Sequence, residues 1–219
     1  MVQVYLTEIQ ELPDPKESPE VMKGLSDARK EKVMRYRHAD DRKRSLGAGL
    51  LLRKVLSCQG VDEDVIRYGR NGKMETDGIC FNLSHGGDMV ICAVSDSAVG
   101  CDIEKVRNAP IGVAKRFFCE NELRYISSCS KEAQDRAFFR LWTMKESYIK
   151  MTGEGMSLPL DHFEMRVEDD VRVYRGGILQ PCYIKEYETE DYHITVCAQE
   201  REFAAQIQYK SIVGKENML

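Results

Sequence analysis

The chain carries the same kinds of predicted elements, in a similar order, in its first and second halves, and this repetition most strongly constrains its fold. In each half, helical regions with apolar stripes and short strands bounded by turns follow one another. Residues 90–93 (Val-Ile-Cys-Ala) are echoed by residues 195–198 (Thr-Val-Cys-Ala). We therefore expect an α/β (α+β) fold of two similar lobes, residues 1–104 and 105–219, each a small sheet packed with helices. A ligand site would lie in the cleft between them.

Caps and turns delimit the predicted elements. A charged helix begins at Ser26 as its N-cap, a second helix stops at Gly60, and a long helix stops at Gly153. The predicted helices cover 26–38, 40–58, 119–128 and 131–151, and the predicted strands cover 2–9, 66–68, 80–83, 89–95, 99–104, 163–167, 171–174, 183–187 and 192–199.

Composition excludes several classes of protein. A formal net charge of -4 argues against a general nucleic-acid binder, which is normally basic. The eight cysteines form no CxxC pair, which favours a reducing cytoplasm, and the four histidines lack the spacing of a zinc site. No apolar run is long enough to cross a bilayer, so we expect no membrane association.

Two carboxylates alternate in the predicted strand 99–104. Alternate residues of a strand share a face, so Asp102 and Glu104 point one way while Cys101 and Ile103 point into the core. Two carboxylates on one face suit Mg²⁺, which prefers one or two protein carboxylates together with phosphates and water. The alternative is a solvated strand face that carries no ligand.

The long helix contains two charges in an unexpected place. At about 100° per residue, Lys145 and Glu146 fall inside the apolar arc of the helix, whereas Lys150 lies one turn beyond Glu146 on the exposed flank. A buried charge is costly unless it is paired or bound to a metal. Lys145 and Glu146 therefore belong to a functional site, or to an internal salt bridge, or the Lys145 stem reaches out to solvent.

Basic residues concentrate in the first two predicted helices. Arg29, Lys32 and Arg44 belong to this group, which forms either a solvated face or a seat for phosphate. Ser84 and His85 end a predicted strand, where side chains can reach a cleft. The spacings support no Ser-His-Asp or Cys-His nucleophile.

Several motifs together resemble a known family. In order along the chain they are residues 82–85 (Asn-Leu-Ser-His), 100–105 (Gly-Cys-Asp-Ile-Glu-Lys), 117–118 (Phe-Phe), 141–147 (Leu-Trp-Thr-Met-Lys-Glu-Ser), Lys150, 155–159 and 181–184. They resemble the 4′-phosphopantetheinyl transferases of the surfactin-synthetase-activating type, over most of the chain from Ser26 onward. The GxDIE and WxxKES motifs at this separation are highly specific.

The resemblance implies a fold and a metal site. The two lobes would be related by a pseudo-twofold axis, with coenzyme A (CoA) bound between them as a substrate. Asp102, Glu104 and Glu146 would coordinate Mg²⁺ as the cofactor, which would explain the charge of Glu146 in the apolar arc.

The resemblance also implies contacts to CoA. Lys145 and Lys150 would contact the pyrophosphate, and Ser84 and His85 would approach the 3′-phosphate. The rest of that phosphate site matches Arg29, where relatives often carry Lys, together with Lys32, Arg44 and Ser45, where some carry Thr. Lys73 stands in a loop that resembles the Gly-Lys-Pro loop beside the adenine, although Met74 replaces the proline.

The implied reaction converts an apo carrier protein to its holo form. A carrier serine attacks the β-phosphate of CoA, and 3′,5′-ADP departs, stabilised by Lys145 or Lys150. The base would be Glu146, a metal-bound water or Glu122. Glu122 matches an acidic position of the family, and its role is either that of a base or structural. The partner would be an acidic acyl, peptidyl or aryl carrier protein of fatty-acid, polyketide or nonribosomal peptide synthesis. It would bind to the surface formed by residues 111–125.

The enzyme is expected to be a monomer, because each chain supplies both halves of the cleft. Two rival functions remain: a CoA-binding regulatory protein without turnover, and a metal-dependent nuclease, which the acidic composition disfavours.

Overall fold

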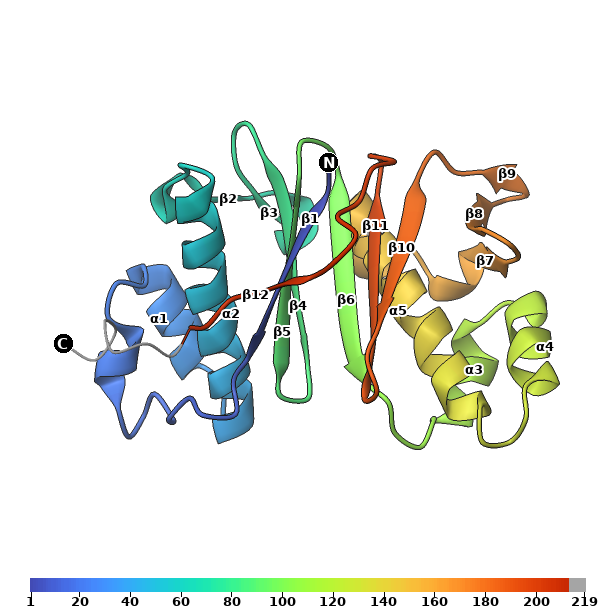
Figure 1. Ribbon diagram of the computed structural model, residues 1–219, viewed down its shortest axis with the longest axis horizontal. Helices are drawn as coiled ribbons and strands as arrows, with labels where there is room; N and C mark the ends of the chain where they lie inside the picture. Colours follow the sequence, from blue (N-terminus) through green and yellow to red (C-terminus); the bar gives the residue numbers. More distant parts are fainter. Residues whose placement is uncertain (213–219) are drawn as a thin grey trace.

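Two sheets lie back to back at the centre of the computed structural model, with helices on their outer faces (Figure 1). The structure describes residues 1–212. No helix within 1–212 has both the length and the apolar character needed to cross a membrane.

The first sheet has the strand order β12-β1-β5-β4. All neighbours are antiparallel except β12, which lies parallel to β1. The outer face of this sheet is covered by α2, against which α1 packs. The elements of this lobe are β1 (Gln3–Glu8), η1 (Pro19–Met22), α1 (Asp27–Met34), α2 (Ala39–Cys58), η2 (Glu63–Val65), β2 (Arg67–Tyr68), η3 (Arg70–Gly72), β3 (Met74–Glu75), β4 (Cys80–Gly86), β5 (Met89–Ser95) and β12 (Gln208–Tyr209).

The second sheet has the order β10-β11-β6 and is antiparallel throughout. The long helix α5 crosses its outer face, and α3, α4 and a separate meander of β7, β8 and β9 surround α5. The elements of this lobe are β6 (Val99–Lys105), α3 (Ile111–Phe117), α4 (Glu120–Ser128), α5 (Gln134–Thr152), η4 (Gly155–Ser157), η5 (Leu160–His162), β7 (Phe163–Val167), β8 (Val171–Arg175), β9 (Ile178–Leu179), β10 (Tyr183–Glu188) and β11 (Tyr192–Ala198).

The two lobes repeat one unit of a strand, a long helix and a hairpin. In the first lobe the unit is β1, α2 and the β4–β5 hairpin, and in the second it is β6, α5 and the β10–β11 hairpin. In both sheets the second strand of the hairpin lies in the middle, between the first strand and its own hairpin partner. The echoed segments 90–93 and 195–198 occupy these middle strands. The expected pair of similar α/β lobes is confirmed.

The sheets divide the chain differently from the expected boundary between residues 104 and 105. β6 hydrogen-bonds to β11, with Asp102 opposite Thr195, and therefore belongs to the second sheet. Short turns join β4, β5 and β6 in the sequence, so the local pattern groups these three strands together. It does not reveal that β6 pairs with β11, which lies far along the chain. The structure places the division between β5 and β6, and residues 199–212 return to the first lobe through β12.

Side chains alternate between two cores, as strand geometry requires. Val4 and Leu6 on β1 face the other sheet, where they meet Ile103 and Val196, whereas Tyr5 faces the helices. The sheets therefore share one apolar layer. Asn82 links them as well, because its Oδ1 accepts a hydrogen bond from the backbone N–H of Cys101 at 2.9 Å.

Candidate functional site

Three polar side chains meet where β4, β6 and α5 come together, on both sides of the boundary between the lobes. The Lys150 ammonium lies 2.6 Å from Asp102 Oδ1 and 2.9 Å from Ser84 Oγ. Ser84 in turn donates to Asp102 Oδ1 at 2.7 Å. Ser84 comes from the first lobe, whereas Asp102 and Lys150 come from the second, so the site requires both lobes.

Asp102 is the centre of an acidic cluster. Its side chain is 6% exposed, and its Oδ2 is buried without a hydrogen-bond partner. Burial raises the pKa of Glu104 and of Glu146, and the negative charge of Asp102 raises both pKa values further. Asp102 therefore repels both glutamates, and the cations beside this cluster are Lys150 and Arg107, whose guanidinium lies 3.4 Å from Glu104.

Strand and helix periodicity produce this cluster. Asp102 and Glu104 share the face of β6 toward α5, while Cys101 and Ile103 lie in the core between the sheets, as the alternation predicts. On α5, Glu146 and Lys150 lie four residues apart and so project from one side of the helix. The exposed flank expected for Lys150 is in fact the seam between the lobes, where it is only 26% exposed.

The side chains within 1–212, as they stand, include no group of three histidine, cysteine or acidic residues arranged to hold a metal ion. The donor set nevertheless fits a divalent cation. The unpartnered Oδ2 of Asp102 is a free oxygen ligand, and a cation would relieve the repulsion that raises the pKa values of Glu104 and Glu146.

Lys145 and Glu122 lie elsewhere, in the closed interior of the second lobe. Their side chains are fully buried, with Lys145 Nζ 2.7 Å from Glu122 Oε1. Lys145 also donates to the carbonyls of Leu160 and Phe163, at 2.8 and 2.7 Å. Glu122 accepts from the N–H groups of Cys119 and Met165.

This pair is the internal salt bridge that the sequence left as an alternative. Neither side chain exposes any surface in this arrangement, and the expected contact of Lys145 with CoA and the expected catalytic role of Glu122 stay predictions.

Cationic groups gather at the end of β4. Burial lowers the pKa of His85, and the nearby charges of Lys150 and Arg44 lower it further. Arg44 donates to the carbonyl of Gly87 at 3.0 Å and to Asp41 at 2.9 Å. The neighbouring Ser45 has a buried Oγ with no partner. The expected group of His85, Arg44 and Ser84 is thus brought together beside Lys150.

Arg29 and Lys32 differ from each other in orientation. Arg29 is 4% exposed, and its guanidinium faces Met74 Sδ at 3.4 Å and Glu63 at 4.0 Å. It is turned into the first lobe, and its expected contact with phosphate stays a prediction. Lys32 is exposed, and partial desolvation by the surrounding protein and then the charge of Arg29 lower its pKa.

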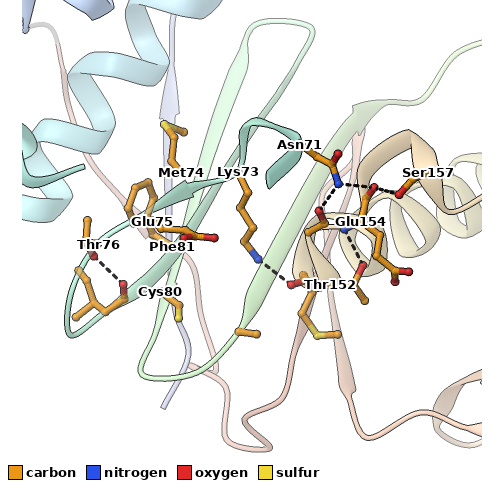
Figure 2. A pocket seen from close by; sticks show the side chains of 14 residues that line it. Asn71, Lys73, Met74, Glu75, Thr76, Cys80, Phe81, Thr152, Glu154 and Ser157 are labelled. Carbon is orange, nitrogen blue, oxygen red and sulfur yellow. Dashed lines mark hydrogen bonds between the residues drawn. The ribbon is translucent and has the colours of Figure 1, made fainter. Parts of the chain in front are cut away.

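A cleft of about 620 Å³ opens between the lobes beside the C-terminal end of α5. Figure 2 shows Lys73 and Asn71 reaching across it from the first lobe. Lys73 donates to the carbonyl of Met151 at 2.7 Å, and burial lowers its pKa. Asn71 donates to the carbonyls of Gly153 and Glu154, at 3.0 and 2.8 Å. Nothing in the local sequence indicates this contact of Asn71, because its partner Gly153 lies 82 residues away.

Fold and site together define a class of protein: a two-lobe α/β protein whose seam brings carboxylates together with lysine, arginine and histidine side chains. This combination suits a phosphorylated ligand bound together with a metal cation. Residues 98–197 match the family model described as the 4′-phosphopantetheinyl transferase superfamily.

Full-length relatives agree with that match. The chain is 37% identical over 212 residues to the 4′-phosphopantetheinyl transferase Sfp of Bacillus subtilis (strain 168), covering 93% of each chain. It is 38% identical over 200 residues to the 4′-phosphopantetheinyl transferase ffp of Bacillus subtilis, covering 87% of this chain and 89% of the relative. The chain therefore belongs to the 4′-phosphopantetheinyl transferase superfamily, as its motifs indicated.

A solved structure is also similar. A holo-(acyl-carrier-protein) synthase from Bacillus anthracis str. Ames in complex with CoA aligns with a TM-score of 0.40 and 14% identity, over 47% of this chain and 94% of that one.

Proposed function

We propose that this protein transfers the 4′-phosphopantetheine group of CoA to a serine of an acyl, peptidyl or aryl carrier protein, converting apo carrier to holo carrier and releasing 3′,5′-ADP. The relatives with this activity in their names align along nearly the whole chain. The single structural observation that carries the proposal is the contact of Lys150 with Ser84 and Asp102, which joins a cation, a hydroxyl and an acid at the seam between the lobes.

We propose that Mg²⁺ is the cofactor and that Asp102, Glu104 and Glu146 hold it. The free Oδ2 of Asp102 and the raised pKa values of the two glutamates support this set. When bound, Mg²⁺ would supply positive charge to the pyrophosphate that is attacked.

Different side chains of the site would bind the pyrophosphate and the 3′-phosphate of CoA. Lys150 is placed to exchange its contact with Asp102 for the pyrophosphate of CoA and to stabilise the departing 3′,5′-ADP. His85, Arg44, Ser45 and Ser84 lie around the end of β4 and would hold the 3′-phosphate, with the exposed Lys32 at its edge. Lys73 would reach the adenine side of the cleft once it leaves the carbonyl of Met151.

Glu146 is the protein group best suited to take the proton of the carrier serine. Burial raises its pKa, which brings it closer to the working pH of a general base. A metal-bound water is the alternative. Glu122 is less suited, because Lys145 and two backbone N–H groups already occupy its oxygens.

The carrier would dock on the surface of α3 and α4. α3 carries Arg116, α4 carries Arg124, and Ile111 at the start of α3 is 40% exposed; positive charge and exposed apolar surface suit an acidic carrier protein. We further propose that the protein is a cytoplasmic monomer. All eight cysteines are free, which supports a reducing compartment, and light scattering would test the monomer.

Intact-protein mass spectrometry tests the function directly. An apo carrier protein incubated with this protein, CoA and Mg²⁺ should gain the mass of one phosphopantetheine. The gain should vanish with EDTA and with Glu146→Ala. Tight CoA binding without any gain across several carriers would instead support a regulatory CoA-binding protein.

A further inference from the structure

Asn71 makes a contact between the lobes that lies outside the acidic cluster. It sits in the turn between β2 and β3 with a left-handed backbone, φ 60°, and is the only residue other than glycine with positive φ within 1–212. Its side-chain amide donates to the carbonyls of both Gly153 and Glu154, at 3.0 and 2.8 Å (Figure 2). One amide group thus binds two successive backbone carbonyls of the opposite lobe.

The segment that Asn71 holds is the end of α5. The last carbonyls of a helix have no partner within the helix, and they must be satisfied from outside. Gly153 caps α5 in the left-handed conformation, with φ 72°, and the chain turns there into η4. The first lobe supplies donors here: Lys73 to the carbonyl of Met151 in the last turn, and Asn71 to the carbonyls of Gly153 and Glu154 just beyond it. The Glu154 carbonyl also accepts from the backbone N–H of Ser157 at 3.3 Å.

The last turn of α5 also contains Lys150, which contacts both lobes at the site. Lys150 is three residues before Gly153 and bonds Ser84 of the first lobe and Asp102 of the second. A shift of the last turn of α5 away from the first lobe would therefore change the distance between Lys150 and Ser84.

We propose that Asn71 is a positioning residue for the transfer reaction, which rests on the function proposed above. It holds the last turn of α5 against the first lobe and thereby keeps Lys150 between Ser84 and Asp102. The position demands two properties at once: a residue that tolerates positive φ, and a side chain with two donor hydrogens. Glycine supplies only the first property. Aspartate tolerates the backbone but would turn a carboxylate oxygen toward two carbonyl oxygens.

The test compares Asn71→Gly and Asn71→Asp with the wild type and with Asn108→Gly, a matched change at an exposed asparagine between β6 and α3. Two readouts are needed. The first is backbone hydrogen exchange without CoA or carrier, which should be faster over residues 151–158 in both Asn71 variants and unchanged in β7 and β8. The second is steady-state kinetics, in which kcat/KM for CoA should fall about three- to tenfold in Asn71→Gly and further in Asn71→Asp, with KM for the carrier unchanged.

Each combination of results decides the proposal. Faster exchange with lower kcat/KM supports positioning. Faster exchange with unchanged kinetics overturns it, because the contact would then serve stability alone. Lower kcat/KM with unchanged exchange also overturns it, since Asn71 would then act directly on a substrate. A wild type that transfers nothing would refute the proposed function and this role with it, while the exchange arm would still report the contact.

Discussion

A charged side chain without exposed surface must be neutralised inside the protein, and Lys145 meets this requirement through Glu122. The pair is completed by two carbonyls on the lysine side and two backbone N–H groups on the glutamate side. The ring of Phe163 adds a cation–π contact, with Lys145 Nζ 4.4 Å from its centroid. This arrangement ties α4, α5 and the start of β7 together.

Removing one partner of this pair should be costly. Lys145→Met leaves the Glu122 carboxylate buried with fewer partners, and we expect the free energy of unfolding to fall by about 3–5 kcal/mol. Urea denaturation measures this change in the free energy of unfolding. Adding Glu122→Gln to this variant should restore part of the loss, because the uncompensated charge is removed. A single variant as stable as the wild type would mean that the pair contributes nothing.

The ion pair of Arg42 with Asp14 predicts a dependence of stability on pH. The hydrogen bond from Arg42 lowers the pKa of Asp14 from 3.8 to about 2. Because the folded pKa lies below the unfolded value, the pair stabilises the protein above pH 3.8, and this stabilisation is lost as the pH falls toward 2. Urea midpoints at pH 5 and pH 3 should therefore differ less in Asp14→Asn than in the wild type. An equal fall in both proteins would contradict the role of the pair.

At the scale of elements, the close approach of α5 to β6 sets the geometry of the site. Gly100 makes this approach possible, since a Cβ at that position would lie 2.1 Å from the carbonyl oxygen of Ser147 and 2.3 Å from the nitrogen of Met151. Both atoms belong to the backbone and cannot turn away. The distance between helix and strand is therefore fixed by the absence of a side chain.

Gly100→Ala should push α5 away from β6. We expect a destabilisation of at least about 1–3 kcal/mol and a large loss of transfer activity, because Lys150 and Glu146 would leave Asp102. Gly112→Ala is the control for stability: it lies in α3 with no atom within 4 Å of the added Cβ, and alanine there should be neutral or stabilising. Urea denaturation of both variants measures the change in stability, and the transfer assay measures the activity of Gly100→Ala. An active, fully stable Gly100→Ala would contradict the close packing.

Local periodicity predicted those parts of the site that lie within one element. The shared face of Asp102 and Glu104 follows from the strand period, and the unusual charges of α5 from the helix period. Contacts between distant segments could not be predicted in this way. The partner of Lys145 comes from another helix, β6 pairs with a strand near the other end of the chain, and Asn71 reaches the opposite lobe.

At the scale of the whole molecule, three features connect the two lobes. Their sheets enclose a common apolar layer, the site takes residues from both, and the segment after β11 crosses back to the first lobe. Along that segment the carbonyl of Ala204 accepts a hydrogen bond from the Tyr187 hydroxyl at 2.7 Å, and Ile212 is buried in the first core.

This shared layer predicts that the lobes unfold together. Residues 1–95 alone would expose the face of β1 and β5 that carries Val4, Leu6 and Ile91, so this fragment should not form a stable fold. For the full chain, calorimetry should give one transition in which the calorimetric and van't Hoff enthalpies agree. Two separate transitions, or a cooperatively folded fragment, would contradict this prediction.

The repeated unit of strand, helix and hairpin also allows equivalent positions of the two lobes to be compared. Superimposing the echoed segments places Val90 on Thr195, and their strand partners then place Thr7 of β1 on Asp102 of β6. Thr7 is buried and uncharged, so the place that holds an acid in the second copy holds none in the first. The two lobes therefore share one scaffold but differ at this position, and only the second carries an acid there.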